Sequence, residues 1–186
     1  MKKIVLFTIF FLSISLIAYS QSVNDLDARN GYKDFKIGDS FEKYKGKLIF
    51  RDYWKNDQNT PTYSVKQEFS YSDLFGYTIK AITLTFKANK LIRIDIFLKE
   101  LVPVGVNMVF NADDFTNVTN KFKSLFGDQN YHVYNDDSYF ISIMQWKGKK
   151  VELWVQFFYK GNGEGKDHIR VSVFDTTLIN RSDSGF

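Results

Sequence analysis

The sequence predicts an α+β fold of two tandem units, each a helix followed by an antiparallel hairpin, forming antiparallel sheet with both helices on one face. Two segments have apolar residues at helical spacing, and two alternate apolar with polar residues around a short turn. The halves of the chain repeat this order, which indicates an internal duplication. The predicted organisation is a signal peptide, residues 1–20, and a single exported domain, residues 21–186, with repeat units at 35–101 and 110–176.

The first twenty residues have the pattern of a secretory signal peptide. Lys2 and Lys3 precede an apolar run from Ile4 to Tyr19, and the small residues Ala18 and Ser20 stand three and one before a cut. The run falls short of the ~20 residues of a membrane-spanning helix. We expect an exported bacterial protein, periplasmic or extracellular, with no integral membrane segment after cleavage; an uncleaved anchor is the alternative.

Composition narrows the functional classes. Without residues 1–20 the chain has 23 basic and 21 acidic residues, and its lysines are spread evenly, so we expect no nucleic-acid partner. The absence of cysteine removes both a disulfide framework and a lipid-bearing residue at the cleavage site. The core must therefore be built from the 19 Phe, 11 Tyr and 3 Trp.

The first predicted helix begins at Asp39, an N-cap residue, and Glu42 completes a capping box three positions later. Its apolar face comprises Phe41, Tyr44 and Leu48.

The second predicted helix is capped by Asp113 or Asp114 and ends at Gly127, a residue able to adopt positive φ. Its apolar face comprises Phe115, Val118, Phe122 and Leu125.

Strict alternation predicts a hairpin over residues 78–98 that turns at Lys87–Lys90, and a second over Tyr139–Tyr159 that turns at Lys147–Lys149. A last strand covers Ile169–Val173. In the first hairpin, one face is polar and should be at least partly wet; it carries Thr83, Thr85, Arg93 and Asp95.

The first unit is about 15 residues longer than the second between its helix and its hairpin, most plausibly within Arg51–Gly76. Long connections are often functional. The junction between the units is expected at Pro103–Gly105.

The segment FKIGDSFEKY, residues 35–44, followed by a hairpin, resembles the helix-start pattern of small exported proteins with repeated α-β-β units. The β-lactamase-inhibitor-protein group and the BamE-like outer-membrane assembly factors are built in this way. The resemblance covers both units through a glycine, a cap and an apolar helix face, while the cysteines of both groups are absent here. It implies a binding or scaffolding module and names no target.

No catalytic or metal-binding arrangement is evident. The two histidines, His132 and His168, have no His or Cys at ligand spacing, and a zinc site needs at least three protein ligands. The pair Asp136–Asp137 has turn composition and at most binds a cation adventitiously. The loop Gly161–Gly165 opens no helix and lacks the Gly-Lys-Ser/Thr of a phosphate loop. We expect no cofactor and no metal.

Surplus aromatic residues mark the candidate binding site. Trp154 and Phe158 lie on the second face of the strand at 151–159, and Tyr53 and Trp54 lie in the long segment Arg51–Gly76. Either the N-terminal arm or that segment covers this face, or the face is an aromatic platform for a protein, peptide or glycan.

The favoured function is therefore an exported, non-catalytic binding or scaffolding module of unidentified target. Two alternatives remain open. One is a secreted hydrolase that uses dispersed carboxylates, with Asp95, Glu152 and Asp175 as candidates. The other is a carrier of an apolar small molecule between the helices and a curved sheet.

Overall fold

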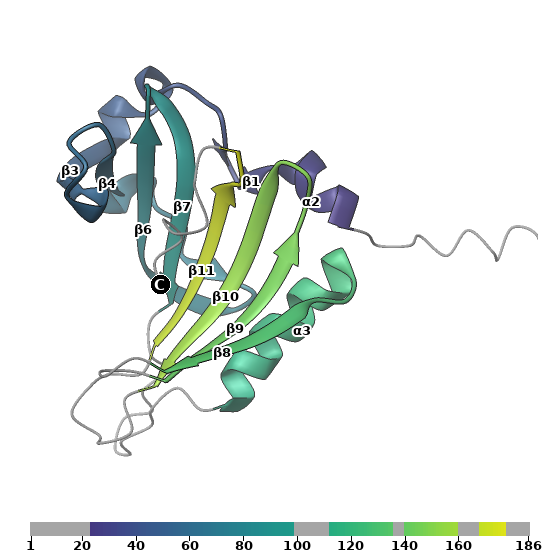
Figure 1. The fold of residues 1–186 in the computed structure, drawn as a ribbon. Coiled ribbons are helices and arrows are strands. Elements are labelled where there is room, and N and C mark those ends of the chain that lie inside the picture. Colours follow the sequence, from purple (N-terminus) through teal and green to yellow (C-terminus); the bar gives the residue numbers. More distant parts are fainter. Residues whose placement is uncertain (1–22, 99–111, 136–139, 160–167, 178–186) are drawn as a thin grey trace, which may run out of the picture.

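The computed structural model describes residues 23–98, 112–135, 140–159 and 168–177 (Figure 1). Four features predicted from the sequence lie outside these ranges: the signal peptide at 1–20, the junction Pro103–Gly105, the pair Asp136–Asp137 and the loop Gly161–Gly165. The division into repeat units at 35–101 and 110–176 stays a prediction.

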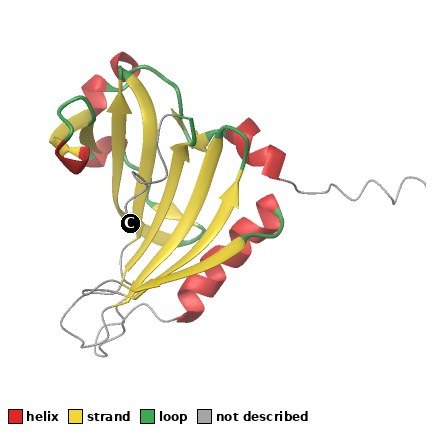
Figure 2. Cartoon of the chain, viewed as in Figure 1, coloured by secondary structure: helices red, strands yellow, loops and turns green. Residues whose placement is uncertain are grey.

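The predicted fold class is wrong, because the described part of the protein is mainly β-sheet with one long helix (Figure 2). The helices are α2 (Val23–Arg29) and α3 (Ala112–Phe126), and single 3₁₀ turns are η1 (Phe41–Lys43), η2 (Lys45–Lys47), η3 (Trp54–Asn56) and η4 (Gln67–Phe69). The strands are β1 (Gly31–Tyr32), β2 (Phe35–Lys36), β3 (Leu48–Tyr53), β4 (Pro61–Val65), β5 (Asp73–Leu74), β6 (Tyr77–Lys87), β7 (Lys90–Leu98), β8 (Asn130–Asn135), β9 (Phe140–Lys147), β10 (Val151–Tyr159) and β11 (His168–Asp175).

One antiparallel sheet of nine strands organises the molecule, in the order β3-β4-β6-β7-β11-β10-β9-β8, with β5 paired to β6 outside this path. Each half of the chain supplies a run of consecutive strands, and the two runs meet through their last members, β7 and β11 (Figure 1). The register places Asp95 opposite Ser172. As a result the first long strand of each half, β3 or β8, lies at an edge of the sheet.

Where the sequence predicts the first helix, the chain forms η1 and η2 instead. The Asp39 carboxylate does not cap a helix; it accepts hydrogen bonds from the Tyr44 hydroxyl at 2.5 Å and the Lys43 ammonium at 2.6 Å. The backbone N–H of Phe41 donates to the Asn89 carbonyl, at 3.1 Å. The helix prediction fails because backbone groups of this segment form hydrogen bonds with the β6–β7 hairpin and are not available for an α-helix.

The apolar face predicted for that helix nevertheless points inward. Tyr44 is 1% exposed and Leu48 is buried, while Phe41 packs on the Phe86 ring at 5.3 Å between centroids. Burial of an aromatic face therefore does not need α-helical geometry at this position.

The second predicted helix is confirmed as α3. Asp113 and Asp114 lie in its first turn, where negative charge favours the helix dipole, and Gly127 ends it with φ of +78°. Its stripe of Phe115, Val118 and Phe122 is buried against the sheet, and Figure 1 shows the helix behind β8 and β9. Within the described residues, neither α3 nor α2 has the length and apolar character that crossing a bilayer requires.

Both predicted hairpins are present. β6 and β7 are joined through Ala88 and Asn89, whose φ angles of +48° and +62° are those of a type I′ turn. β9 and β10 pair Lys147 with Glu152, which settles the register of the second hairpin. The last predicted strand is β11.

The two faces of the sheet are both buried over its centre. The face toward α3, here called the helix-covered face, carries the main core, including Ile94, Leu153 and Val171. The opposite face, here called the second face, was expected to be partly wet in the first hairpin. That expectation is wrong, because all four polar residues of this face are buried. Their exposed fractions are 6% for Thr83, 2% for Thr85, 3% for Arg93 and 8% for Asp95.

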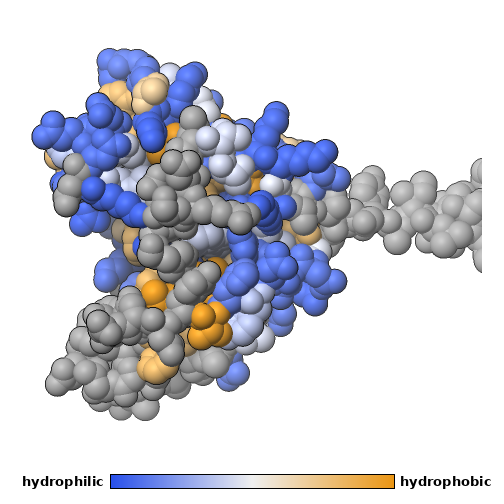
Figure 3. Space-filling model, viewed as in Figure 1, coloured by the Kyte–Doolittle hydropathy of each residue, from blue (hydrophilic) through white to orange (hydrophobic). Residues whose placement is uncertain are grey.

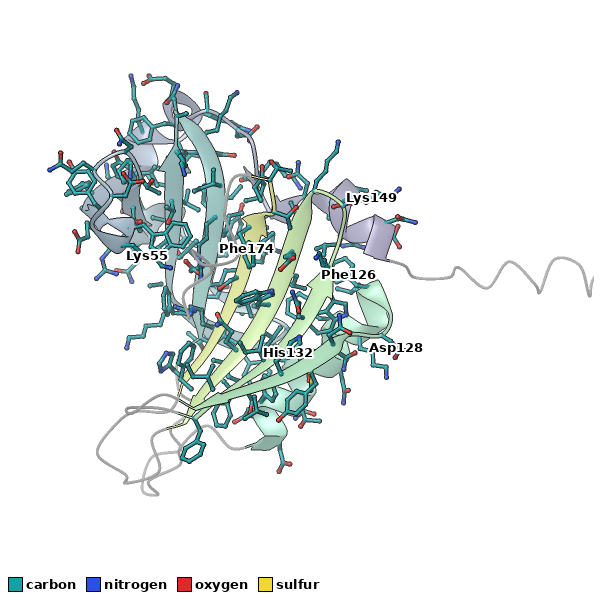
Figure 4. All side chains as sticks on the ribbon, viewed as in Figure 1. Lys55, Phe126, Asp128, His132, Lys149 and Phe174 are labelled. Atoms are coloured by element: carbon teal, nitrogen blue, oxygen red, sulfur yellow. The ribbon has the colours of Figure 1, made fainter. Side chains whose placement is uncertain are left out.

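The short helix α2 is fastened to the β9–β10 hairpin by one carboxylate. Asp27 accepts hydrogen bonds from the backbone N–H groups of Lys149, Lys150 and Val151 at 2.7, 2.9 and 3.1 Å. Figure 4 shows Lys149 at the hairpin tip beside α2. Gly148 is required here, because a Cβ would lie 2.4 Å from the Asp27 carboxylate.

We predict that Asp27→Ala lowers the free energy of unfolding by about 1–3 kcal/mol, because it leaves three backbone donors without their acceptor. Gly148→Ala should also destabilise, by forcing the carboxylate away. The double variant should lose less than the sum, since both changes break one contact. Urea denaturation measures all three; strict additivity would contradict the assignment. Asp128→Ala, at an exposed ion pair with Lys123, is the control and should be nearly neutral.

Candidate functional site

A second, smaller core occupies the second face of the sheet. It is formed by five side chains: Ile92, Ile141, Ile143, Trp154 and Phe174. Figure 3 shows hydrophobic residues gathered over the lower part of this face, and Figure 4 marks Phe174 near its centre.

Trp154 is a core residue in this arrangement. Its side chain is 7% exposed, its ring meets that of Phe174 edge to face at 4.9 Å, and its Nε1 donates to Glu152 Oε2 at 3.1 Å. Burial of the ring and of its polar atom leaves little of Trp154 for an external partner.

Three of the four predicted binding residues come together at the second core: Trp154 belongs to it, and Trp54 and Phe158 pack against it. Tyr53 is 40% exposed at the end of β3, while Trp54 is half-buried and packs against the second core. Phe158 is half-buried and stacks on the His168 ring at 4.5 Å. Because Trp54 belongs to the segment Arg51–Gly76, the structure favours the interpretation in which that segment helps to cover the second face.

A buried polar cluster lies beside this core, across β7, β11 and β10. Arg93 Nε donates to both Asp95 oxygens at 3.0 and 2.8 Å, and Ser172 Oγ donates to Asp95 Oδ1 at 2.5 Å. Gln156 Oε1 accepts from Arg170 Nε at 2.9 Å. The Arg93 guanidinium also lies 5.2 Å from the Trp54 ring and 5.6 Å from that of Phe174.

The cluster holds Asp95 in its charged form. Burial alone would raise the pKa of Asp95, but the cations of Arg93 and Arg170, with hydrogen bonds from Arg93 and Ser172, outweigh burial and lower it. Burial lowers the pKa of Arg170 to about 10, so Arg170 is still charged at neutral pH. A carboxylate with these partners is a structural anion and a poor general acid.

The carboxylates of the hydrolase alternative are not brought together. The Asp95 carboxylate accepts a hydrogen bond from Arg93, and the Glu152 carboxylate accepts hydrogen bonds from Trp154 and Gln145. Asp175 follows Phe174, a second-face residue, so alternation places it on the helix-covered face, and it accepts from Thr177. This placement gives no support to a catalytic pair of carboxylates.

The histidines are also separate. His132 Nε2 lies 3.0 Å from Gln145 Oε1 on β9, and His168 stacks on Phe158. Within the ranges that the structure describes, no group of three His, Cys, Asp or Glu side chains could hold a metal ion.

The exposed apolar residues gather at the two edges of the sheet. Near β3 they are Ile49, Phe50, Tyr53 and Phe69, with exposures of 57%, 50%, 40% and 43%. Near β8 they are Tyr131, Val133 and Phe140, with exposures of 56%, 55% and 54%. In the described chain, every large apolar side chain that is exposed belongs to one of these two groups.

The β8 group forms one surface. Tyr131 pairs with Met144 and Val133 with Ser142, so both point to the same side as Phe140, two positions from Ser142 on β9. That side is the helix-covered face, because Met144 packs on the main core. His132 lies on the opposite side, as Figure 4 shows.

The two edges differ in their protection against pairing. The pairing of β3 with β4 skips Arg51 between Phe50 and Asp52, and this bulge disrupts the β3 edge. The charged side chains of Arg51 and Asp52 protect the same edge further. The sequence of β8, NYHVYN, has no Lys, Arg, Asp, Glu, Pro or Gly, and its register with β9 is unbroken. β8 therefore presents the less protected edge.

Sequence reasoning missed the β8 surface. Apolar and polar residues alternate over Tyr131, His132 and Val133. However, residues 128–135 directly follow a helix and carry many polar side chains, a pattern typical of a loop. The available signal was a run of β-propensity residues without charge, next to the predicted hairpin.

Comparison with known proteins finds no matching family model, no matching curated protein and no matching solved structure. The resemblance to the β-lactamase-inhibitor-protein and BamE-like groups therefore stays a prediction.

We predict that Trp154→Ala costs about 3–5 kcal/mol of folding free energy, as aromatic truncations in cores do. Leu153→Ala, on the main-core side of the same strand, should cost about 2–5 kcal/mol and serves as the comparison. Chemical denaturation measures both. A loss below about 1 kcal/mol for Trp154→Ala alone would show that the second face is not a core.

We predict that Asp95→Asn destabilises the fold by about 3–5 kcal/mol at neutral pH, because it leaves Arg93 buried without its counter-charge. The folded-state pKa of Asp95 lies below the unfolded value, so its contribution is present above the unfolded pKa and is lost as pH falls through the folded pKa. The difference between wild type and variant should therefore shrink below about pH 4. Denaturation at pH 7, 5 and 3 tests this, and a constant difference would contradict it.

Proposed function

We propose that this protein is an exported, non-catalytic binding module that holds a protein partner along the β8 edge of its sheet. The observation that carries the proposal is the distribution of exposed apolar side chains, which gather at the sheet edges and form a single surface on β8 and β9. Export rests on the signal-peptide pattern of residues 1–20.

An extended segment of a partner fits this edge by strand addition. Among the described strands β8 has a neighbour, β9, on one side only. An added strand would gain main-chain hydrogen bonds, and its alternate side chains would lie beside Tyr131 and Val133. Phe140 extends the same apolar surface from β8 onto the neighbouring strand β9.

The chemistry of the edge indicates the partner segment. The exposed side chains are aromatic or β-branched and uncharged, so the best complement is a strand with aromatic or β-branched residues at every second position. Flanking charge on the partner contributes little, because β8 carries no acid, lysine or arginine.

We predict that peptides of about ten residues selected from a random display library on the purified protein share this alternating pattern. Val133→Lys should weaken their binding by about tenfold or more, because a lysine on an edge strand opposes pairing. Fluorescence anisotropy with a labelled peptide gives the dissociation constants.

Ile49→Lys is the matched control, since Ile49 has almost the same exposure, 57% against 55%, on the opposite edge. It should leave binding within about twofold of wild type. Equal losses for both variants would contradict a β8 site. Analytical ultracentrifugation provides a further check. If the wild-type protein and Ile49→Lys are dimers and Val133→Lys is a monomer, the edge binds a second copy of this chain, and the partner proposal is overturned.

A further inference from the structure

A cavity of about 430 Å³ lies where the end of α2, the short strands β1, β2 and β5, and α3 meet. Its lining includes Arg29, Lys33, Lys36, Asp73, Phe122 and Phe126. Phe126 is marked in Figure 4. The volume falls within the range of small-molecule sites, roughly 300–1,000 Å³.

Part of the cavity lining is an aromatic and aliphatic wall. Leu74, Phe122 and Phe126 are 6%, 7% and 5% exposed, so the main core fixes their positions. The Phe75 and Phe122 rings meet edge to face at 4.9 Å, and Phe122 stacks with Phe126 at 6.2 Å. This wall suits the hydrocarbon part of a ligand.

The lining also carries three cations, Arg29, Lys33 and Lys36, against the single carboxylate of Asp73. Within the described part of the chain, none of these three cations forms an ion pair. Asp73 already accepts a hydrogen bond from Ser72 Oγ at 3.1 Å. The lining is therefore net positive and open to an anion.

All three cations have neighbours that hold them in place. Lys36 Nζ donates to the Arg29 backbone carbonyl at 2.8 Å, and the Arg29 guanidinium lies 5.8 Å from the Phe126 ring. Lys33 Nζ lies 5.4 Å from the Tyr71 ring. This support reduces the entropy that a long cationic side chain loses when it binds a ligand.

Tyr32 adds no negative charge to the lining. Burial, with smaller effects of Asp73 and Tyr71, raises the pKa of Tyr32 to about 12. Its hydroxyl donates to the Asp73 backbone carbonyl at 3.1 Å. The phenol therefore remains neutral under all ordinary conditions.

We infer that this cavity is a binding site for a small amphipathic carboxylate, with its head group at Arg29 and Lys33 and its hydrocarbon part against Phe122 and Phe126. A neutral apolar molecule would leave the cations without a counter-charge, and a compact anion would leave the half-buried side chains of Phe75 and Leu125 partly in water. A ligand with one negative head and one apolar tail satisfies both halves.

This site is separate from the proposed partner edge. Tyr131, Val133 and Phe140 are not among the lining residues, and Val133→Lys leaves the lining unchanged. Loss of peptide binding at β8 therefore does not imply loss of ligand binding in the cavity, and the reverse also holds.

The test is calorimetric titration of the purified protein with four probes: decanoate, decanol, decyltrimethylammonium and acetate. Decanoate should bind saturably at one site per chain. Decanol should bind at least about tenfold more weakly, because it lacks the charged hydrogen bonds, and the cationic and short probes should show no saturable binding. Equal affinity for decanoate and decanol, or no saturable binding of decanoate, would overturn the inference.

The double variant Arg29→Gln/Lys33→Gln should weaken decanoate binding by about tenfold or more. Lys121→Gln/Lys149→Gln makes the same change in net charge on exposed residues outside the lining and should stay within about twofold of wild type. Equal weakening in both double variants would reduce the effect to overall charge and overturn the site.

Leu125→Trp supplies a second variant that does not depend on the cations. A larger side chain from the half-buried Leu125 should fill the cavity and abolish decanoate binding while the helical circular dichroism signal is retained. Unchanged decanoate affinity in a folded Leu125→Trp protein would place the ligand elsewhere.

Discussion

The pairing of β7 with β11 is the contact on which the rest of the structure depends. It is the link by which the strands of the first half, β3 to β7, and of the second half, β8 to β11, become one sheet. Asp95 and Ser172 face each other across this junction and are hydrogen-bonded at 2.5 Å, and Arg93 reaches Ser172 at 3.3 Å. A slip of one residue would turn the Asp95 carboxylate toward the apolar helix-covered face. The buried polar cluster therefore specifies the register, whatever its net contribution to stability.

The same junction determines where binding edges can arise. Because the halves meet through their last strands, β3 and β8 are left at the margins of the sheet. Such edges invite pairing with another chain unless they are protected. A bulge at Arg51 protects β3, whereas no bulge or charge interrupts β8. The apolar surface of Tyr131 and Val133 thus lies on the edge that is chemically suited to a partner.

Local patterns in the sequence predicted the elements that depend on local interactions. The α3 stripe and its final Gly127 are contained within one segment, and the β6–β7 turn needs only Ala88 and Asn89. The helix expected at Asp39 depended on a capping box, but tertiary hydrogen bonds to Asn89 and neighbouring residues took its place. Propensity is a weak guide where such bonds compete with it.

The candidate sites were harder to predict, because they depend on strands brought together from distant segments. Arg93 and Asp95 look solvent-facing in their own hairpin, yet Ser172, 79 and 77 residues further along, completes a buried cluster with them. Trp154 looks like surplus surface until Phe174 and the segment containing Trp54 close over it. The cavity draws Arg29 and Phe126 from helices far apart in the chain. Period-2 alternation therefore identified which residues share a face, but not whether that face is covered.

Helix α3 lies behind β8 and β9 (Figure 1) and lines the cavity, so it is the element through which the two proposed surfaces could communicate. Its first half packs on the sheet through Phe115, which stacks on Phe157, and its last turn supplies Phe122 and Phe126 to the cavity. The stripe between these ends is buried against the main core, including Val118 at 0% exposure. A ligand shifts an equilibrium only by its differential affinity for two states, and a helix clamped along its length offers no second state of low energy. The cavity and the β8 edge should therefore act as independent sites on one rigid scaffold.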